Sequence, residues 1–241
     1  MPSKINKKRF FKSLVISLVV FVIFWVINSA NNPVDQYVIN SNMAKAAFLK
    51  KDYKKAVELY KKAEKNAQNF QINRNGTLLY INNCIASSYF GLHDFENSEK
   101  YFNKAINLGL SLNDNNSQYN LLLSYKSLAS LYVIEKKYKI AEELYFKSLD
   151  ISSKMSDPDK DLASIYEGLG ILYSKEKDYI RAEKYLNRAL DIKEELYGKN
   201  SPELIRTLIF LTALNKRTSH MDKAQILLDR INTIYKKQKQ R

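Results

Sequence analysis

The sequence predicts an all-α protein, a right-handed superhelical solenoid of about five helix pairs preceded by one N-terminal transmembrane helix. Three observations lead to this prediction. Only six glycines and four prolines occur among 241 residues, so the turn residues that punctuate β-rich folds are scarce. A pattern of aromatic and small residues recurs five times, at intervals of 41 to 43 residues, as expected of a repeat array. A long uncharged apolar segment follows a basic N-terminus.

The N-terminal 30 residues predict a membrane anchor behind a cytoplasmic basic head. The head, residues 1–12, contains five positive side chains: Lys4, Lys7, Lys8, Arg9 and Lys12. Residues 13–30 are interpreted as the transmembrane helix because Ser13 to Ile27 carries no charge. With the two phenylalanines before it, this stretch approaches the roughly 20 apolar residues that cross a bilayer.

Charge asymmetry predicts the orientation of this anchor. No lysine or arginine lies between residues 28 and 44, so the N-terminus is expected in the cytoplasm and the solenoid outside it. The Lys-, Asn- and Ile-rich composition favours a bacterial inner membrane. The alternative is a cleaved signal peptide, but cleavage after Ala30 would place Asn28 where a small residue is required. Residues 31–37 are predicted as a linker.

Residues 38–238 are predicted to form the solenoid. In the second helix of each predicted pair four positions recur. The first is aromatic or apolar, a small residue follows three positions later, a large residue four positions after that, and a small or aliphatic residue a further three positions on. The five sets are Tyr53/Ala56/Tyr60/Ala63, Phe95/Ser98/Phe102/Ala105, Tyr138/Ala141/Tyr145/Ser148, Tyr179/Ala182/Leu186/Ala189 and Met221/Ala224/Leu228/Ile231. The predicted units are residues 38–70, 77–112, 120–155, 160–198 and 202–238.

A second helix-forming pattern precedes each set and has a small residue at its centre. These residues are Ala44, Ala86, Ala129, Gly170 and Thr212. Small residues at fixed places in two successive helices allow their backbones to approach closely. Neither helix can bury its apolar stripe alone, so the pairs must stack, which generates a solenoid with a concave face. Asn-rich stretches, with Asn75-Gly76 the clearest helix breaker, are predicted as turns between units.

The stretch "LGILYSKEKDYIRAEKYLNRAL", Leu169 to Leu190, resembles the tetratricopeptide repeat family in its Leu-Gly, tyrosine, alanine and leucine positions. The resemblance extends over about residues 37–238. The period is longer than the usual ~34 residues and is similar to the 42-residue variety seen in kinesin light chains and many bacterial proteins.

This resemblance implies a concave face that binds protein or peptide partners through the first helices. Transferring the family's ligand-facing positions to the three central units gives nine candidate partner-binding residues. They are Asn83, Ser87, Phe90, Lys126, Ser130, Val133, Glu167, Ile171 and Ser174. Their mixture of polar and apolar side chains suits an extended or helical peptide.

No catalytic, cofactor or metal site is predicted. The single cysteine, Cys84, excludes a disulfide framework, and His93 and His220 are expected in exposed turns separated by three repeats. Although the net charge is +14, lysines and glutamates alternate on the second helices, which predicts solvated faces rather than a nucleic-acid surface. Weak contact with anionic lipid headgroups stays open.

The leading functional hypothesis is therefore a membrane-anchored, non-enzymatic scaffold that binds protein partners at the cell envelope. Two alternatives are kept. One is a cleaved, secreted or periplasmic binding protein with the same solenoid. The other is a regulatory, peptide-receptor subunit of a larger complex whose active site lies on another chain.

Overall fold

The computed structural model describes residues 17–18, 32–155 and 159–239, and within these residues the regular structure is helical, without a β-strand. In the described residues from 32 onward, ten α-helices follow one another as five pairs. The pairs are α2 (Pro33–Leu49) with α3 (Tyr53–Ala67), α4 (Arg74–Gly91) with α5 (Phe95–Gly109), α6 (Asn115–Ile134) with α7 (Tyr138–Ser152), α8 (Asp159–Glu176) with α9 (Tyr179–Tyr197), and α10 (Ile205–Arg217) with α11 (Met221–Lys239). A short 3-10 turn, η1 (Pro202–Leu204), precedes α10.

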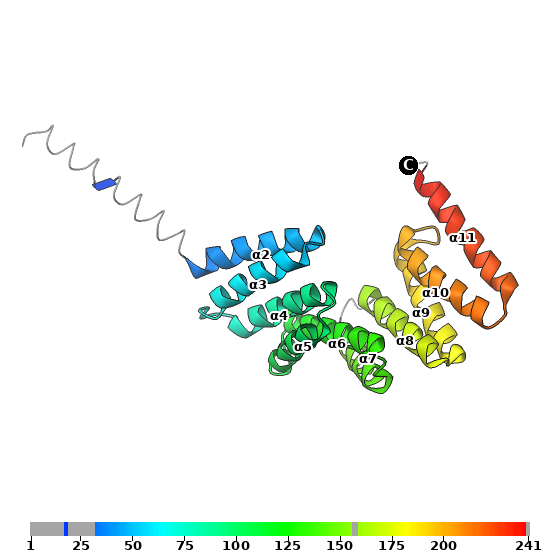
Figure 1. The fold of residues 1–241 in the computed structure, drawn as a ribbon, viewed down its shortest axis with the longest axis horizontal. Coiled ribbons are helices and arrows are strands. Elements are labelled where there is room, and N and C mark those ends of the chain that lie inside the picture. The colour runs from blue at the N-terminus through cyan, green and yellow to red at the C-terminus, as the bar shows by residue number, and fades with distance from the viewer. Residues whose placement is uncertain (1–16, 19–31, 156–158, 240–241) are drawn as a thin grey trace, which may run out of the picture.

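The helix pairs form an open arc with α2 at one end and α11 at the other (Figure 1). Each second helix packs on the first helix of the next pair, and the first helices α4, α6, α8 and α10 also contact one another in succession. Among the described residues no comparable packing joins α5 to α7 or α7 to α9. The first helices therefore form the inner layer of the arc.

The second helix of each pair begins at the first residue of the predicted pattern. α3, α5, α7, α9 and α11 start at Tyr53, Phe95, Tyr138, Tyr179 and Met221. The aspartate that precedes three of these helices caps them. A side-chain oxygen of Asp52, Asp94 or Asp178 accepts a hydrogen bond from the backbone N–H three residues later, at 3.0–3.1 Å. Each cap satisfies a donor that a helix leaves unpaired at its N-terminus.

The turn within every pair has the same backbone conformation. The residue two positions before each second helix is left-handed, with φ of 58° to 66°. These residues are Lys51, His93, Lys136, Lys177 and Ser219. In the first turn Lys51 N–H donates to Phe48 O and Asp52 N–H donates to Ala47 O, both at 2.9 Å. These two bonds define a Schellman C-cap. His93 and His220 both lie in these turns, as predicted.

The small residues of the repeat pattern are buried where helices meet. Ala86, Ala129 and Ala141 have no exposed surface. Serine replaces alanine at two such positions because its hydroxyl finds a backbone acceptor on the facing helix. Ser98 Oγ donates to Ala86 O at 3.0 Å, and Ser148 Oγ donates to Leu122 O at 3.3 Å.

Successive pairs are also joined by a tyrosine of the inner layer and a glutamate of the preceding second helix. Tyr132 Oη donates to Glu99 Oε1 at 2.7 Å, and one unit later Tyr173 donates to Glu142. Burial, followed by the hydrogen bond to Glu99, raises the pKa of Tyr132. Its hydroxyl therefore stays protonated, and able to donate, at neutral pH.

Replacing Tyr132 by phenylalanine is expected to lower the free energy of unfolding by about 1 kcal/mol, the usual net value of one such hydrogen bond. Urea denaturation followed by circular dichroism measures the change. Tyr179→Phe is the matched control, because among the described residues the Tyr179 hydroxyl has no hydrogen-bond partner. Equal midpoints for the two variants would show that the link to Glu99 adds no stability.

Several predicted boundaries differ from the structure, and α4 and α6 begin at Arg74 and Asn115, before the predicted unit starts at 77 and 120. α2 begins at Pro33, inside the predicted linker, because Asn32 caps the helix by accepting from Val34 N–H at 2.9 Å and proline suits the first helical turn. The pair Asn75-Gly76 does not break a helix, because α4 already begins at Arg74. A side chain at position 76 would crowd the Asn73 side chain, whose Oδ1 would lie 2.4 Å from a Cβ there.

The predicted localisation, a single-pass membrane protein with an exported solenoid, is wrong. Within the described stretches, no helix combines the length and the apolar character needed to span a bilayer. The 20-residue helix α6, for example, carries asparagines, serines and a lysine along its length. The predicted anchor, residues 13–30, lies outside the described residues apart from Ser17 and Leu18. Likewise, nothing in the described part of the chain supports the membrane and lipid partners.

Candidate functional site

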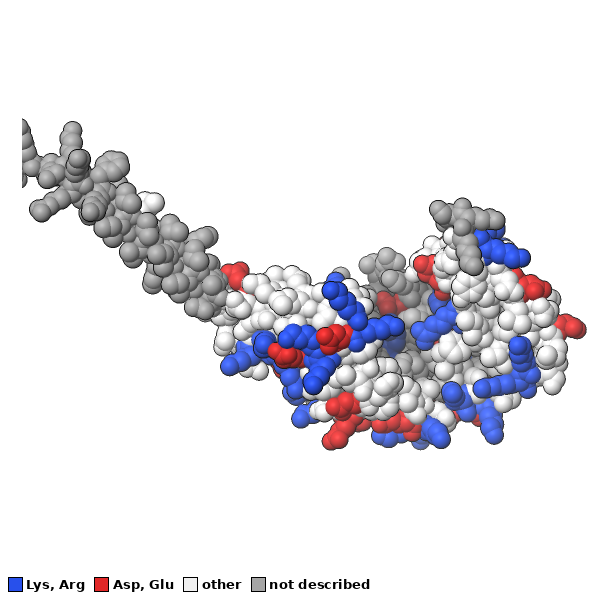
Figure 2. Space-filling view, turned by 45° about the horizontal axis from the view of Figure 1, so that its top comes forward, with Lys and Arg blue, Asp and Glu red and all other residues white. Residues whose placement is uncertain are grey.

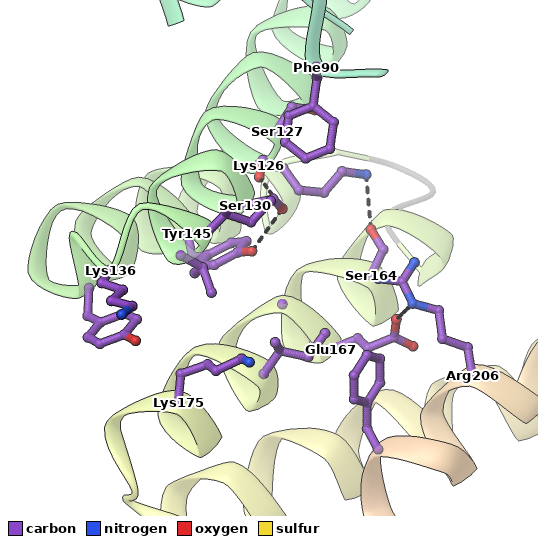
Figure 3. A pocket seen from close by; sticks show the side chains of 16 residues that line it. Phe90, Lys126, Ser127, Ser130, Lys136, Tyr145, Ser164, Glu167, Lys175 and Arg206 are labelled. Atoms are coloured by element: carbon purple, nitrogen blue, oxygen red, sulfur yellow. Dashed lines mark hydrogen bonds and ion pairs between the residues drawn. The ribbon is translucent and has the colours of Figure 1, made fainter. Parts of the chain in front are cut away.

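A groove of about 640 Å³ lies on the inner layer of the arc, where four first helices converge. Figure 3 shows its lining, with α6 and α8 facing each other across the space. One residue comes from α4, two come from α10, and the rest come from α6, the turn after α6, α7 and α8. The lining residues are Phe90, Lys126, Ser127, Ser130, Val133, Ile134, Lys136, Tyr138, Tyr145, Ser164, Glu167, Gly168, Ile171, Lys175, Arg206 and Phe210.

Lys126 bridges α6 to α8 at one side of the groove. Its Nζ donates to Asp161 Oδ1 at 2.8 Å and to Ser164 Oγ at 2.9 Å. Both charged side chains are about one-fifth exposed, at 19% each. The ammonium is therefore held in place from two directions while it still faces the groove (Figure 3).

Glu167 is the most deeply buried charge of the groove, with 5% of its side chain exposed. Its Oε2 accepts from Lys193 Nζ at 2.5 Å and from Thr207 Oγ1 at 2.6 Å, and its Oε1 accepts from Arg206 Nε at 2.8 Å. The carboxylate thereby ties α8 to α9 and α10. Burying a carboxylate is unfavourable unless it is paired and hydrogen-bonded, and here it has three donors.

Two hydroxyl groups form the polar floor between these charges. Ser130 Oγ lies 2.9 Å from Tyr145 Oη, and it also donates to the backbone oxygen of Lys126 at 3.0 Å. Burial raises the pKa of Tyr145 to about 12, although the hydrogen bond to Ser130 opposes the rise. Tyr145 is thus a neutral hydrogen-bonding group at physiological pH.

Six of the nine predicted partner-binding residues lie together in this groove: Phe90, Lys126, Ser130, Val133, Glu167 and Ile171. Asn83 and Ser87 line a second, smaller pocket of about 330 Å³ that also borders Lys126. Ser174 lines neither of these two pockets, and its Oγ accepts from Arg217 Nη1 at 3.5 Å.

The side chain of Asn83 forms hydrogen bonds between two helices of the inner layer. Its Nδ2 donates to Asn120 O at 2.8 Å and its Oδ1 accepts from Ser124 Oγ at 2.7 Å. With 8% of its surface exposed, it joins α4 to α6 and has little capacity left for a ligand.

The second pocket is mainly aromatic and contains the single cysteine. Phe48, Tyr60, Tyr80 and Phe102 surround Cys84 there. Burial raises the pKa of the Cys84 thiol to about 11, so the thiolate that reacts with electrophiles or metals is scarce at neutral pH. The cysteine is therefore a packing residue among these aromatic side chains.

Sequence reasoning missed Lys136, Lys175, Arg206 and Phe210. Lys136 lies in the turn after α6, and Lys175 lies in the last turn of α8. They do not occupy equivalent repeat positions, because the counterpart of Lys136 in the next unit is Lys177, so the repeat pattern alone gave no signal for the pair. Arg206 and Phe210 belong to α10 of the last unit, whereas the nine sequence-based candidates come from the three central units.

The fold and groove define the protein class, a helical-repeat solenoid with a polar and apolar groove on its inner layer. Models of the tetratricopeptide repeat family match residues 161–237 and residues 81–108. The chain therefore contains tetratricopeptide repeats, as predicted. No curated protein matches the chain.

Solved structures share this architecture. BtubC (BKLC) from P. vanneervenii has 22% identity and a TM-score of 0.74, covering 95% of this chain and 92% of its own. The nearly identical TPR-like repeats of a kinesin light chain assigned in Podosopora anserina have 16% identity and a TM-score of 0.67, covering 84% and 95%. The Rap conjugation gene regulator of the plasmid pLS20, in complex with the Phr* peptide, has 15% identity and a TM-score of 0.70, covering 87% and 56%. At these identities the likeness concerns the fold.

Proposed function

We propose that this protein is a non-enzymatic interaction scaffold that binds a peptide segment of a partner protein in the inner-layer groove. The observation that carries the proposal is the groove itself, which combines apolar walls with hydrogen-bonding and charged side chains already held in position. Peptide sites are generally concave, with apolar anchoring surface and a few placed polar groups. Groups held in place before binding lose little entropy when a ligand arrives.

The structural comparisons support this proposal at the level of the fold. The pLS20 Rap regulator was solved with a peptide bound, so an array of this architecture can hold a peptide. The groove also agrees with the sequence-based hypothesis, because most of the predicted partner-facing residues line it.

Panning the full chain against a random dodecapeptide library displayed on phage tests the proposal. Peptides that the chain captures are expected to lose about tenfold or more in affinity for Ile171→Trp, because a bulky side chain would occupy the groove. Ile72→Trp is the matched control, since Ile72 is 86% exposed and lies between α3 and α4, away from the groove. Failure to capture any peptide, or equal binding by the two variants, would refute the proposal.

A further inference from the structure

The groove has an excess of positive charge. Four cations line it, namely Lys126, Lys136, Lys175 and Arg206, against the single carboxylate of Glu167. That carboxylate is already shared between Arg206 and Lys193, which has 13% of its side chain exposed. In Figure 2 basic side chains flank the hollow of the arc. Lys126 is paired with Asp161 and Arg206 with Glu167, so Lys136 and Lys175 supply the positive charge that a ligand in the groove would meet without a carboxylate partner.

The four cations retain unused donors. Lys136 and Lys175 are exposed and form no ion pair with any described residue. Arg206 contacts Glu167 through Nε, its side chain is 71% exposed, and its terminal nitrogens stay open to the solvent. Lys126 uses two of its three donors, on Asp161 and Ser164. Carboxylates are the peptide groups that complement such donors best.

The cations lie in two groups. Lys126 and Arg206 lie on one side of the view in Figure 3, and Lys136 and Lys175 lie on the other. From Lys126 to Ile134, the last residue of α6, the helix advances eight positions, a rise of ~12 Å, and Lys136 lies two residues further on in the turn after α6. An extended peptide covers that distance with about four or five residues. The groove is also lined by the apolar side chains of Val133, Ile171 and Phe210.

We propose that the partner segment is an acidic peptide with two carboxylate side chains about four or five residues apart and an apolar residue between them. One carboxylate pairs with Arg206 and Lys126, and the other pairs with Lys136 and Lys175. The apolar residue packs against Ile171 and Phe210. This inference rests on the proposed function, because it specifies which peptides the groove accepts.

The test is the composition of the peptides that the full chain selects from the random library. Enrichment of Asp or Glu at two positions four or five apart, with an apolar residue between them, is the expected result. Captured peptides that bind in the groove but show no acidic enrichment would overturn this inference and leave the proposed function intact. A library from which nothing is captured would overturn both.

Paired lysine variants test the second carboxylate site. Lys136→Gln with Lys175→Gln is expected to weaken a selected acidic peptide about tenfold or more, measured by fluorescence anisotropy, because two charge-assisted hydrogen bonds are lost. Lys100→Gln with Lys139→Gln removes the same charge from exposed residues outside the groove, and its affinity should match that of the unaltered chain. Equal weakening by both pairs, or tighter binding of a labelled oligothymidine than of the peptide, would refute the acidic-peptide assignment.

Discussion

Glu167→Ala is expected to lower the free energy of unfolding by about 3–5 kcal/mol, the usual cost of removing one partner from a buried ion pair. The side chain of Lys193 is only 13% exposed, and the substitution leaves it without a carboxylate partner. It also removes the oxygen that accepts the hydrogen bond from the Thr207 hydroxyl. Denaturation in guanidinium chloride, followed by far-ultraviolet circular dichroism, measures the loss. Because a repeat array is coupled mainly between neighbours, faster hydrogen exchange is expected in α8 to α10.

Glu58→Ala separates this effect from the general loss of a salt bridge. Glu58 pairs with Lys55 and Lys62, which lie about one turn before and one turn after it on α3, at 3.1 and 2.9 Å, and all three side chains are about half-exposed. Exposed pairs on a helix contribute little, so this variant should unfold at the same denaturant concentration as the unaltered chain. Unchanged unfolding of Glu167→Ala would mean that Lys193 finds another partner or reaches the solvent.

The repeat pattern was sufficient to predict the packing of the solenoid. A small residue, such as Ala141 or Ala182, occurs at this position of every unit because two helices meet there, so the period of small residues predicts the contact. The starts of the second helices could be predicted for the same reason, since Tyr53 and its equivalents occupy the first helical position.

The turn geometry and the ion pairs of the groove could not be predicted in this way. Left-handed φ usually selects glycine, but the Schellman turns place lysine, histidine or serine there, so no residue type marks them. Glu167 and Thr207 lie 40 positions apart, about one repeat, which places both on neighbouring inner helices. Repeat spacing predicts that proximity. It does not predict that Lys193 of α9 is long enough to bind both Glu167 and Thr207.

Gly170→Val is expected to destabilise the protein by about 2–3 kcal/mol, because the helices α8 and α9 leave no room for a larger residue. A Cβ at position 170 would lie 2.6 Å from Leu186 Cγ and 3.2 Å from the Leu186 backbone nitrogen. The backbone atom cannot yield without moving α9. This cost exceeds the gain of up to about 1 kcal/mol that replacing a helical glycine can bring. Denaturation in urea gives the change in unfolding free energy.

The double variant Gly170→Val with Leu186→Ala tests whether the clash is the cause. Leu186→Ala alone opens a cavity, because Leu186 is 1% exposed, and should cost about 2–5 kcal/mol. Together the two substitutions should cost less than their sum, since the valine side chain can enter the space that the leucine leaves. Residues in direct contact commonly couple in this way, whereas distant ones add. Strict additivity would show that Gly170 is required for a reason other than its approach to Leu186.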